Sequence, residues 1–116
     1  MVSSESKERR DEAKYSLDGI RRLAGFQQIE LRGRRQRRHV AELNYELADL
    51  CHCLVCLQEH HFSHSERYAN DRHWHDVYKM RHTGKDGVTH DMYIKLRLDR
   101  GCIVIELCSF HPEGWL

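Results

Sequence analysis

The most constraining feature of this sequence is a regular alternation of apolar and polar side chains from Val88 to Leu98. The apolar positions are Val88, Met92, Ile94, Leu96 and Leu98. The polar positions are Thr89, Asp91, Tyr93, Lys95 and Arg97. A period of two residues predicts a β-strand with one buried face and one face in water. The wet face would carry a phenol, an ammonium and a guanidinium in a row, and such a surface suits a phosphate.

A hairpin is expected to follow this strand, because Asp99-Arg100-Gly101 is a turn signal and the next residues are apolar. Cross-strand partners share a face, so apolar residues should pair with apolar residues. This rule predicts a four-residue loop and the pairs Ile94–Leu107, Leu96–Ile105, Leu98–Ile103 and Lys95–Glu106. A two-residue turn that places Ile94 opposite Ile105 satisfies the same rule.

The last part of this hairpin contains a conflict. Strict alternation from Ile103 would place His111 on the apolar side, away from Lys95. We therefore expect a bulge near Cys108–Ser109, or a loss of strand geometry before Pro112, that turns His111 toward the polar face.

Helices are predicted upstream of the hairpin. Ser16 can cap a short helix that ends at Gly25, and its apolar stripe is Leu17, Ile20, Leu23 and Ala24. Residues 40–57 have a second helical pattern with a break near Asn44. Residues 26–31 fit either a short strand or a connector.

These elements predict an α+β fold, in which N-terminal helices pack on a twisted antiparallel sheet. A strand is expected at residues 73–80, after a polar loop at residues 66–71. A chain of 116 residues suits one domain, which we expect to span residues 13–116. Residues 1–12 are charged and lack apolar spacing, so they should form a flexible tail.

No stretch of the sequence is apolar enough for a signal peptide or a membrane helix. Three of the five cysteines, Cys51, Cys53 and Cys56, lie in the second helical pattern. Free thiols in a core fit a reducing compartment, so a cytoplasmic protein is expected. Residues 51 and 53 lie about 200° apart around a helix, which favours core thiols over a metal site.

A basic run, Arg32-Gly33-Arg34-Arg35-Gln36-Arg37-Arg38-His39, precedes the second helical pattern. Seven arginines and one acid, Glu30, lie between Arg21 and His39. Two interpretations remain open. The run is either a solvated loop that leads into a helix, or a segment whose guanidinium groups contact a nucleic-acid backbone.

The side chains available for chemistry are histidine, tyrosine, lysine and arginine. Five of the ten histidines lie between His60 and His75. The sequence has no glycine-rich phosphate loop, Gly-x-Ser-x-Gly elbow, His-Glu-x-x-His motif or acidic cluster for magnesium. The set suits metal-free cleavage of RNA, in which the 2′-hydroxyl is the nucleophile, side chains move protons and cations stabilise the phosphorane.

Several motifs, in order along the chain, resemble one protein family. They are Tyr15-x-Leu17-x-x-Ile20-x-x-Leu23, the stretch Cys51 to Phe62, Trp74-x-Asp76-Val77-Tyr78, Tyr93-x-Lys95 and Ser109-Phe110-His111. Together they cover roughly residues 14–111 and resemble the motility quorum-sensing regulator toxins. The resemblance implies the ribonuclease half of a bacterial type II toxin–antitoxin pair, with a RelE-like fold.

The resemblance also implies the activity and the partners. It implies an mRNA endoribonuclease that needs no metal or other cofactor, inhibits growth, and is inhibited by an antitoxin, a small DNA-binding protein encoded next to it. Tyr93 and Lys95 match the family pattern, whereas histidines stand where lysine or another polar residue is expected. The catalytic residues implied are His64, His75, Tyr93, Lys95 and His111. The RNA-binding residues expected are Arg34, Arg35, Arg37, Arg38, Tyr78 and Arg97.

Other interpretations stay open at this point. The chain could be a non-catalytic RNA- or protein-binding module that uses the arginine run, or a zinc protein that uses its cysteines and histidines. Trp74 and its neighbours could simply pack under the main helix. Three further histidines, His39, His52 and His90, are expected to be structural. His75 and Lys95 should be exposed, so their removal should cost little stability.

Overall fold

The computed structural model describes residues 6–116. Its helices are α1 (Leu17–Gly25), α2 (Arg34–Glu42), α3 (Leu47–Val55) and the short 3₁₀ helix η1 (Glu59–His61). Its strands are β1 (Lys7–Arg10), β2 (Ile29–Leu31), β3 (Phe62–Tyr68), β4 (His75–Thr83), β5 (Thr89–Asp99) and β6 (Val104–Pro112). The strands form one sheet in the order β1-β3-β4-β5-β6-β2, antiparallel except where β2 pairs with β6. This arrangement confirms the predicted α+β class.

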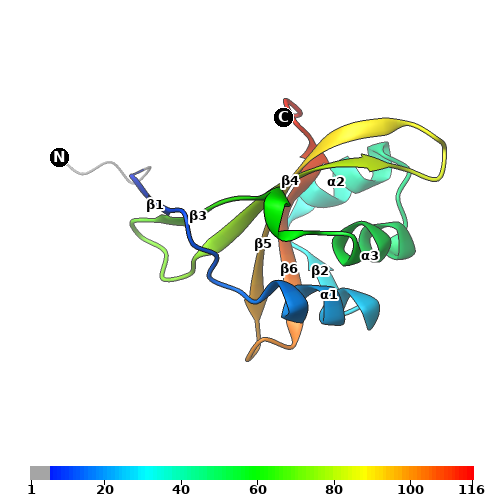
Figure 1. Cartoon of the computed structure of the whole chain (residues 1–116). Coiled ribbons are helices and arrows are strands. Elements are labelled where there is room, and N and C mark those ends of the chain that lie inside the picture. Colours follow the sequence, from blue (N-terminus) through cyan, green and yellow to red (C-terminus); the bar gives the residue numbers. More distant parts are fainter. Residues whose placement is uncertain (1–5) are drawn as a thin grey trace.

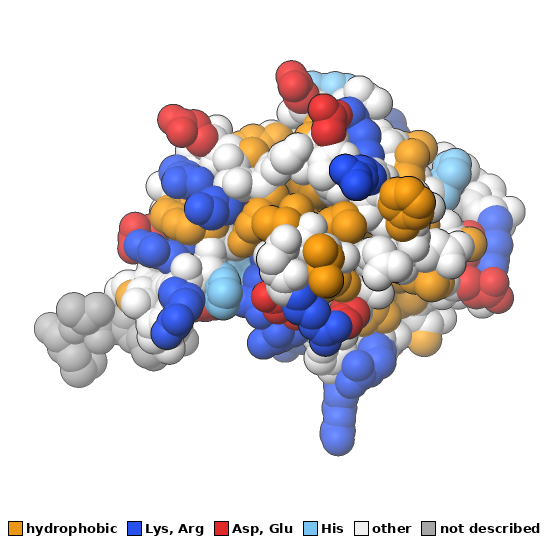
Figure 2. Space-filling model, turned by 90° about the horizontal axis from the view of Figure 1, so that it is seen from below, with side chains coloured by type: hydrophobic (Ala, Val, Ile, Leu, Met, Phe, Trp, Pro, Cys, Tyr) orange, Lys and Arg blue, Asp and Glu red, His pale blue; other side chains and the backbone are white. Residues whose placement is uncertain are grey.

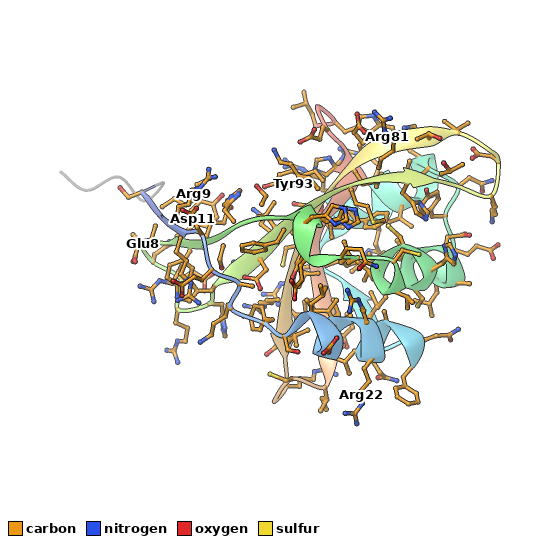
Figure 3. All side chains as sticks on the ribbon, in the orientation of Figure 1. Glu8, Arg9, Asp11, Arg22, Arg81 and Tyr93 are labelled. Carbon is orange, nitrogen blue, oxygen red and sulfur yellow. The ribbon has the colours of Figure 1, made fainter. Side chains whose placement is uncertain are left out.

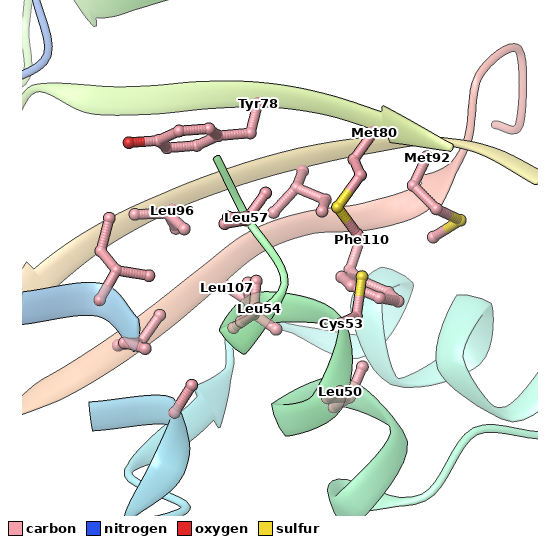
Figure 4. Close-up of a cluster of buried hydrophobic side chains, with 14 of the residues drawn as sticks. Leu50, Cys53, Leu54, Leu57, Tyr78, Met80, Met92, Leu96, Leu107 and Phe110 are labelled. Atoms are coloured by element: carbon pink, nitrogen blue, oxygen red, sulfur yellow. The ribbon is translucent and has the colours of Figure 1, made fainter. Parts of the chain in front are cut away.

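The helices pack on one face of the sheet and enclose the core (Figure 1). In Figure 4, Leu50, Cys53 and Leu54 of α3 meet Leu107 and Phe110 of β6. Alternation along β5 places Met92, Ile94 and Leu96 in this core, as predicted, and all three are fully buried. The opposite face of the sheet therefore receives the polar residues of β5. No helix in residues 6–116 is long and apolar enough to cross a membrane.

The helix predictions are partly confirmed. The Ser16 hydroxyl caps α1 by accepting a hydrogen bond from the Gly19 backbone N–H at 3.1 Å. The break near Asn44 is present, because Asn44 adopts a positive φ of 58° between α2 and α3. Of the two interpretations left open for residues 32–39, the solvated loop is wrong, since Arg34 already begins α2. His39 and Val40 bury one side of α2, which leaves the arginines on the solvated side.

Two strands were missed because their residues are polar. The expected loop at residues 66–71 begins too early, since β3 continues to Tyr68 and buries Ser65 and Glu66. Residues 7–10 of the expected flexible tail form β1, which pairs with β3. Residues 1–5 of that tail lie outside the described residues. Polar strands of this kind are stable because charged partners on neighbouring strands satisfy their side chains.

The β5–β6 hairpin has a different register from the one predicted. Leu98 pairs with Ile105 rather than Ile103, and Arg97 rather than Lys95 lies opposite Glu106. The ladder extends to the pair Asp99–Val104, so the four-residue loop comprises residues 100–103. Positive φ angles at three consecutive loop residues, 53°, 72° and 66° from position 100, close this turn.

The Trp74-x-Asp76-Val77-Tyr78 motif attaches the segment before α1 to the sheet. Asp76 is fully buried, and its carboxylate accepts hydrogen bonds from the backbone N–H groups of Lys14 at 3.0 Å and Tyr15 at 2.9 Å. Tyr15 in turn donates its hydroxyl proton to the Trp74 carbonyl at 2.8 Å. The guanidinium groups of Arg10 and Arg67 lie 4.5 Å and 5.0 Å from the centre of the Trp74 ring, and Trp74 is not part of the core under the main helix. The motif is therefore structural.

Candidate active site

The five residues predicted to be catalytic lie on the same face of the sheet, opposite the helices. Cross-strand pairing fixes this arrangement: His64 of β3 pairs with Val77, Val77 with Lys95, and Lys95 with Ser109. The next row on this face contains Tyr93 and its partner His111. Figure 3 shows Tyr93 on the side of the sheet away from α1 and α3.

A β-bulge turns His111 toward this face. The register shifts between Lys95 and Leu96, whose partners are Ser109 and Leu107, so Cys108 is the extra residue. The bulge expected near Cys108–Ser109 is thus confirmed. The His111 ring stacks on Tyr93 with centroids 5.5 Å apart and an angle of 17°. His111 Nδ1 lies 2.7 Å from the Pro112 carbonyl oxygen. A carbonyl oxygen can only accept a hydrogen bond, so Nδ1 is the donor.

Glu66 of β3 is a site residue that sequence reasoning missed. Its side chain is 2% exposed, and its carboxylate lies 2.7 Å from His64 Nε2 and 3.1 Å from Lys95 Nζ. Lys7 approaches the same carboxylate to 3.5 Å. Burial alone would raise the pKa of Glu66, but the hydrogen bond from His64 and the charge of Lys95 hold it at about 2. The available signal is an acid two residues after His64, in a stretch whose polar composition predicts a loop.

Lys95 is the central cation of this face. Its side chain is only 16% exposed, so the expectation of a well-exposed lysine is wrong. Burial acts to lower the pKa of Lys95, but the neighbouring Glu66 carboxylate outweighs it and the pKa is raised. Lys95 therefore stays an ammonium group at neutral pH. Its Nζ also lies 5.7 Å from the centre of the Tyr68 ring.

His75 is also buried, at 8% exposure, rather than exposed as expected. Burial, followed by the positive charge of Lys95, lowers the pKa of His75 below its ordinary value. Its imidazole is thus held neutral at pH 7. Burial likewise raises the pKa of the Tyr93 phenol, which stays protonated and can donate a hydrogen bond.

A polar pocket of about 250 Å³ opens beside Lys95. Its lining residues are Arg32, Tyr68, Asp71, His75, Lys95, Arg97 and Cys108. Arg97 is 7% exposed and donates from Nε to Glu106 at 2.8 Å, and Arg32 donates to the same carboxylate at 2.9 Å. Each cation of the pocket therefore has a carboxylate partner, and Arg97 is less available to RNA than expected.

The other predicted RNA-binding residues are dispersed. Arg34, Arg35, Arg37 and Arg38 are exposed on α2 and do not line the pocket. Arg32, from the same basic run, does line it. Tyr78 is 1% exposed and belongs to the core, so the prediction that it contacts RNA is wrong. Tyr78 lies in a central strand, opposite its cross-strand partner Ile94. Cross-strand partners share a face, so the Tyr78 ring is buried under the helices.

The histidines and cysteines outside this face have other roles. His39 is 1% exposed and donates from Nε2 to the Leu116 carbonyl at 3.0 Å, as suits a structural residue. Cys51 and Cys53 are core thiols as predicted, whereas Cys56 is exposed. Within residues 6–116, no three His, Cys, Asp or Glu side chains are grouped to hold a metal ion.

A comparison with known protein families gives a match over most of the chain. A family model described as motility quorum-sensing regulator, toxin of MqsA, matches residues 12–111. This chain belongs to the motility quorum-sensing regulator family. It is thus a toxin of a toxin–antitoxin system, with an antitoxin of the MqsA type as its partner. No curated protein matches the sequence.

Family membership gives the two sequence blocks separate meanings. The block from Trp74 to Tyr78 holds the N-terminal segment and the core, so it marks the fold of a motility quorum-sensing regulator. The block Tyr93-x-Lys95 lies on the open face, which is the face of the sheet opposite the helices, beside three histidines and a buried carboxylate.

Proposed function

We propose that this toxin is a metal-independent endoribonuclease that cleaves mRNA and thereby inhibits translation and growth. The observation that carries the proposal is the position of Lys95 on the open face, between His64 on the β3 side and His111 on the β6 side. In-line attack on a phosphodiester requires a proton acceptor and a proton donor on opposite sides of the phosphorus, with a cation between them.

The chemistry follows from the side chains present. The RNA 2′-hydroxyl is the nucleophile, and the ammonium group of Lys95 stabilises the charge that develops on the phosphorane. Histidines on both sides transfer the protons. The protonated phenol of Tyr93 donates a hydrogen bond to a phosphate oxygen, while the neutral imidazole of His75 and the pocket beside it hold a neighbouring nucleotide.

The decisive experiment is cleavage of mRNA by the purified protein in the presence of EDTA. We expect cleavage with 2′,3′-cyclic phosphate and 5′-hydroxyl ends, because the 2′-oxygen forms the new bond to phosphorus. A matched RNA with a single 2′-deoxynucleotide at a mapped cleavage position should survive at that position. Intact RNA in EDTA, with cleavage only after a metal ion is added, would contradict the proposal.

The antitoxin is proposed to be a small DNA-binding protein encoded next to the toxin, and the cytosol is the proposed compartment because mRNA is translated there. Partner binding is supported by large hydrophobic side chains on the surface. They are Phe26, Leu47, Val55, Val88, Ile103 and Leu116. Figure 2 shows hydrophobic side chains exposed among basic ones on one face. Co-expression with the neighbouring gene should give a stable complex and relieve growth arrest.

A further inference from the structure

Three side chains at the start of β3 form a hydrogen-bonded chain. The Ser63 hydroxyl lies 2.9 Å from His64 Nδ1, and His64 Nε2 lies 2.7 Å from a Glu66 oxygen. Neighbouring residues of a regular strand point to opposite faces, so Ser63 and His64 would not normally meet. The register shift between Phe62 and His64 makes Ser63 an inserted residue and permits this contact.

The direction of these hydrogen bonds follows from Glu66. A carboxylate only accepts hydrogen bonds, so His64 must carry a proton on Nε2. The second oxygen of Glu66 accepts from Lys95, so the carboxylate cannot turn away without losing a charged partner. In the neutral imidazole, Nδ1 then has a free lone pair and accepts the proton of the Ser63 hydroxyl.

We propose that Glu66 is a positioning residue that fixes His64 in the Nε2–H tautomer, so that Nδ1 is the proton acceptor for the RNA 2′-hydroxyl. This inference rests on the proposed function for the identity of the substrate, although the tautomer itself does not. The hydroxyl of Ser63 marks where a hydroxyl donor can approach Nδ1, and the 2′-hydroxyl takes its place.

The 2′-oxygen loses its proton to His64 Nδ1 and forms a bond to phosphorus. The bond between phosphorus and the 5′-oxygen breaks, and that oxygen takes the Nε2 proton of an imidazolium at His111, on the other side of Lys95, while Nδ1–H stays on the Pro112 carbonyl. Glu66 keeps its negative charge throughout and stabilises the imidazolium that forms on His64, as the buried acid of a catalytic triad does.

The charged and titratable groups around His64 come from three further strands. They are Lys7 and Arg9 of β1, His75 of β4 and Lys95 of β5. Of these groups and Glu66, Glu66 is the one that forms a hydrogen bond with His64. A change at Glu66 therefore acts directly on the His64 ring.

The test uses Glu66→Gln, which keeps the shape but replaces one oxygen by an NH₂ group. Lys95 can only donate, so the amide oxygen of the variant must turn toward Lys95 and its NH₂ group toward His64. His64 must then accept at Nε2, and its tautomer is inverted. Two-bond ¹H–¹⁵N spectra of histidine-labelled protein without RNA report the tautomer directly, and the signal of His64 is assigned by its loss in His64→Ala.

The matched control is Glu106→Gln, because Glu106 is also a buried carboxylate on this face but accepts hydrogen bonds from the arginines Arg97 and Arg32. We expect the Nε2–H tautomer in the wild type and in Glu106→Gln, and the Nδ1–H tautomer in Glu66→Gln. Single-turnover cleavage by Glu66→Gln should fall by at least about 100-fold. Its RNA affinity should stay within about threefold of the wild type, since Glu66 is not a pocket residue.

The outcomes separate this inference from the proposed function. A wild-type protein with the Nδ1–H tautomer overturns the inference, even if Glu66→Gln does not fold. Cleavage by folded Glu66→Gln within threefold of the wild type also overturns it. A wild type that does not cleave RNA in EDTA overturns the proposed function, while the tautomer remains a measured property of the protein.

Discussion

Glu66 and Glu106 are two buried carboxylates on the same face of one sheet, with 2% and 5% of their surface exposed. Glu106 is paired with Arg97 and Arg32, whose guanidinium groups do not release a proton in proteins. Glu66 is paired with His64 and Lys95, side chains that can take part in proton transfer or move toward a developing charge. In the proposed mechanism, similar burial thus serves two functions: Glu106 organises the pocket, and Glu66 organises the reacting groups.

The largest effect should come from removing the cation beside Glu66. Lys95→Met should lower the rate of RNA cleavage by about 10²–10³-fold, because the phosphorane loses its nearest positive charge. Lys79→Met is the matched control: Lys79 lies on the same face, opposite Tyr93, but its side chain is half exposed and pairs with Glu113. Single-turnover assays on both variants check this expectation, and equal losses would contradict the special role of Lys95.

The second effect concerns stability in acid. The folded-state pKa of Glu66, about 2, lies below its ordinary value of 4.5. The Glu66 carboxylate therefore stabilises the fold above pH 4.5, and this contribution, about 3 kcal/mol, is lost as the pH falls from 4.5 toward 2. Urea denaturation between pH 3 and pH 6 should show a smaller pH dependence for Glu66→Gln than for the wild type. Parallel curves would show that Glu66 is not the group responsible.

A third effect tests the other carboxylate. Glu106→Gln should destabilise the fold by about 2 kcal/mol, because Arg97 keeps only Asp99, at 3.6 Å, as a charged partner. Cleavage at saturating RNA should change little, since Glu106 contacts neither His64 nor Lys95. Denaturation and single-turnover cleavage are measured on the same preparation. A cleavage loss as large as that of Lys95→Met would remove the distinction between the two carboxylates.

The same contrast explains what could be predicted from the sequence. Alternation identified the buried and polar faces of β5, because apolar side chains leave a period of two wherever one face is covered. Glu66 was missed because β3 is polar between its terminal residues Phe62 and Tyr68, and a strand stabilised by buried ion pairs has no apolar period. Tyr78 was misassigned because the residues of one motif alternate between faces, so being near Trp74 says nothing about facing the substrate.

The hairpin shows how local geometry limits such predictions. The bulge could be predicted because two expectations for His111 disagree. The family motif implies that His111 lies on the polar face, whereas strict alternation places it on the apolar face. The register was wrong by two residues, since apolar pairing is satisfied by any even shift and only the turn decides among them. The turn depends on left-handed backbone at Arg100 and Cys102, residues whose types do not require it.

The smallest effect should come from the arginines of α2, which resemble the arginine partners of Glu106 rather than the partners of Glu66. Arg34 and Arg35 are exposed on α2 and can bind a backbone phosphate without taking part in proton transfer. The double variant Arg34→Gln, Arg35→Gln should weaken RNA binding by about three- to tenfold at low salt and reduce its salt dependence. Cleavage at saturating RNA should stay within about twofold of the wild type.

The control is Arg81→Gln. Arg81 is exposed and pairs with Asp91 across the β4–β5 hairpin, so this variant should change neither RNA binding nor cleavage. Equal RNA affinity of the double variant and the wild type at every salt concentration would exclude α2 from the RNA-binding surface and restrict that surface to the pocket beside Lys95.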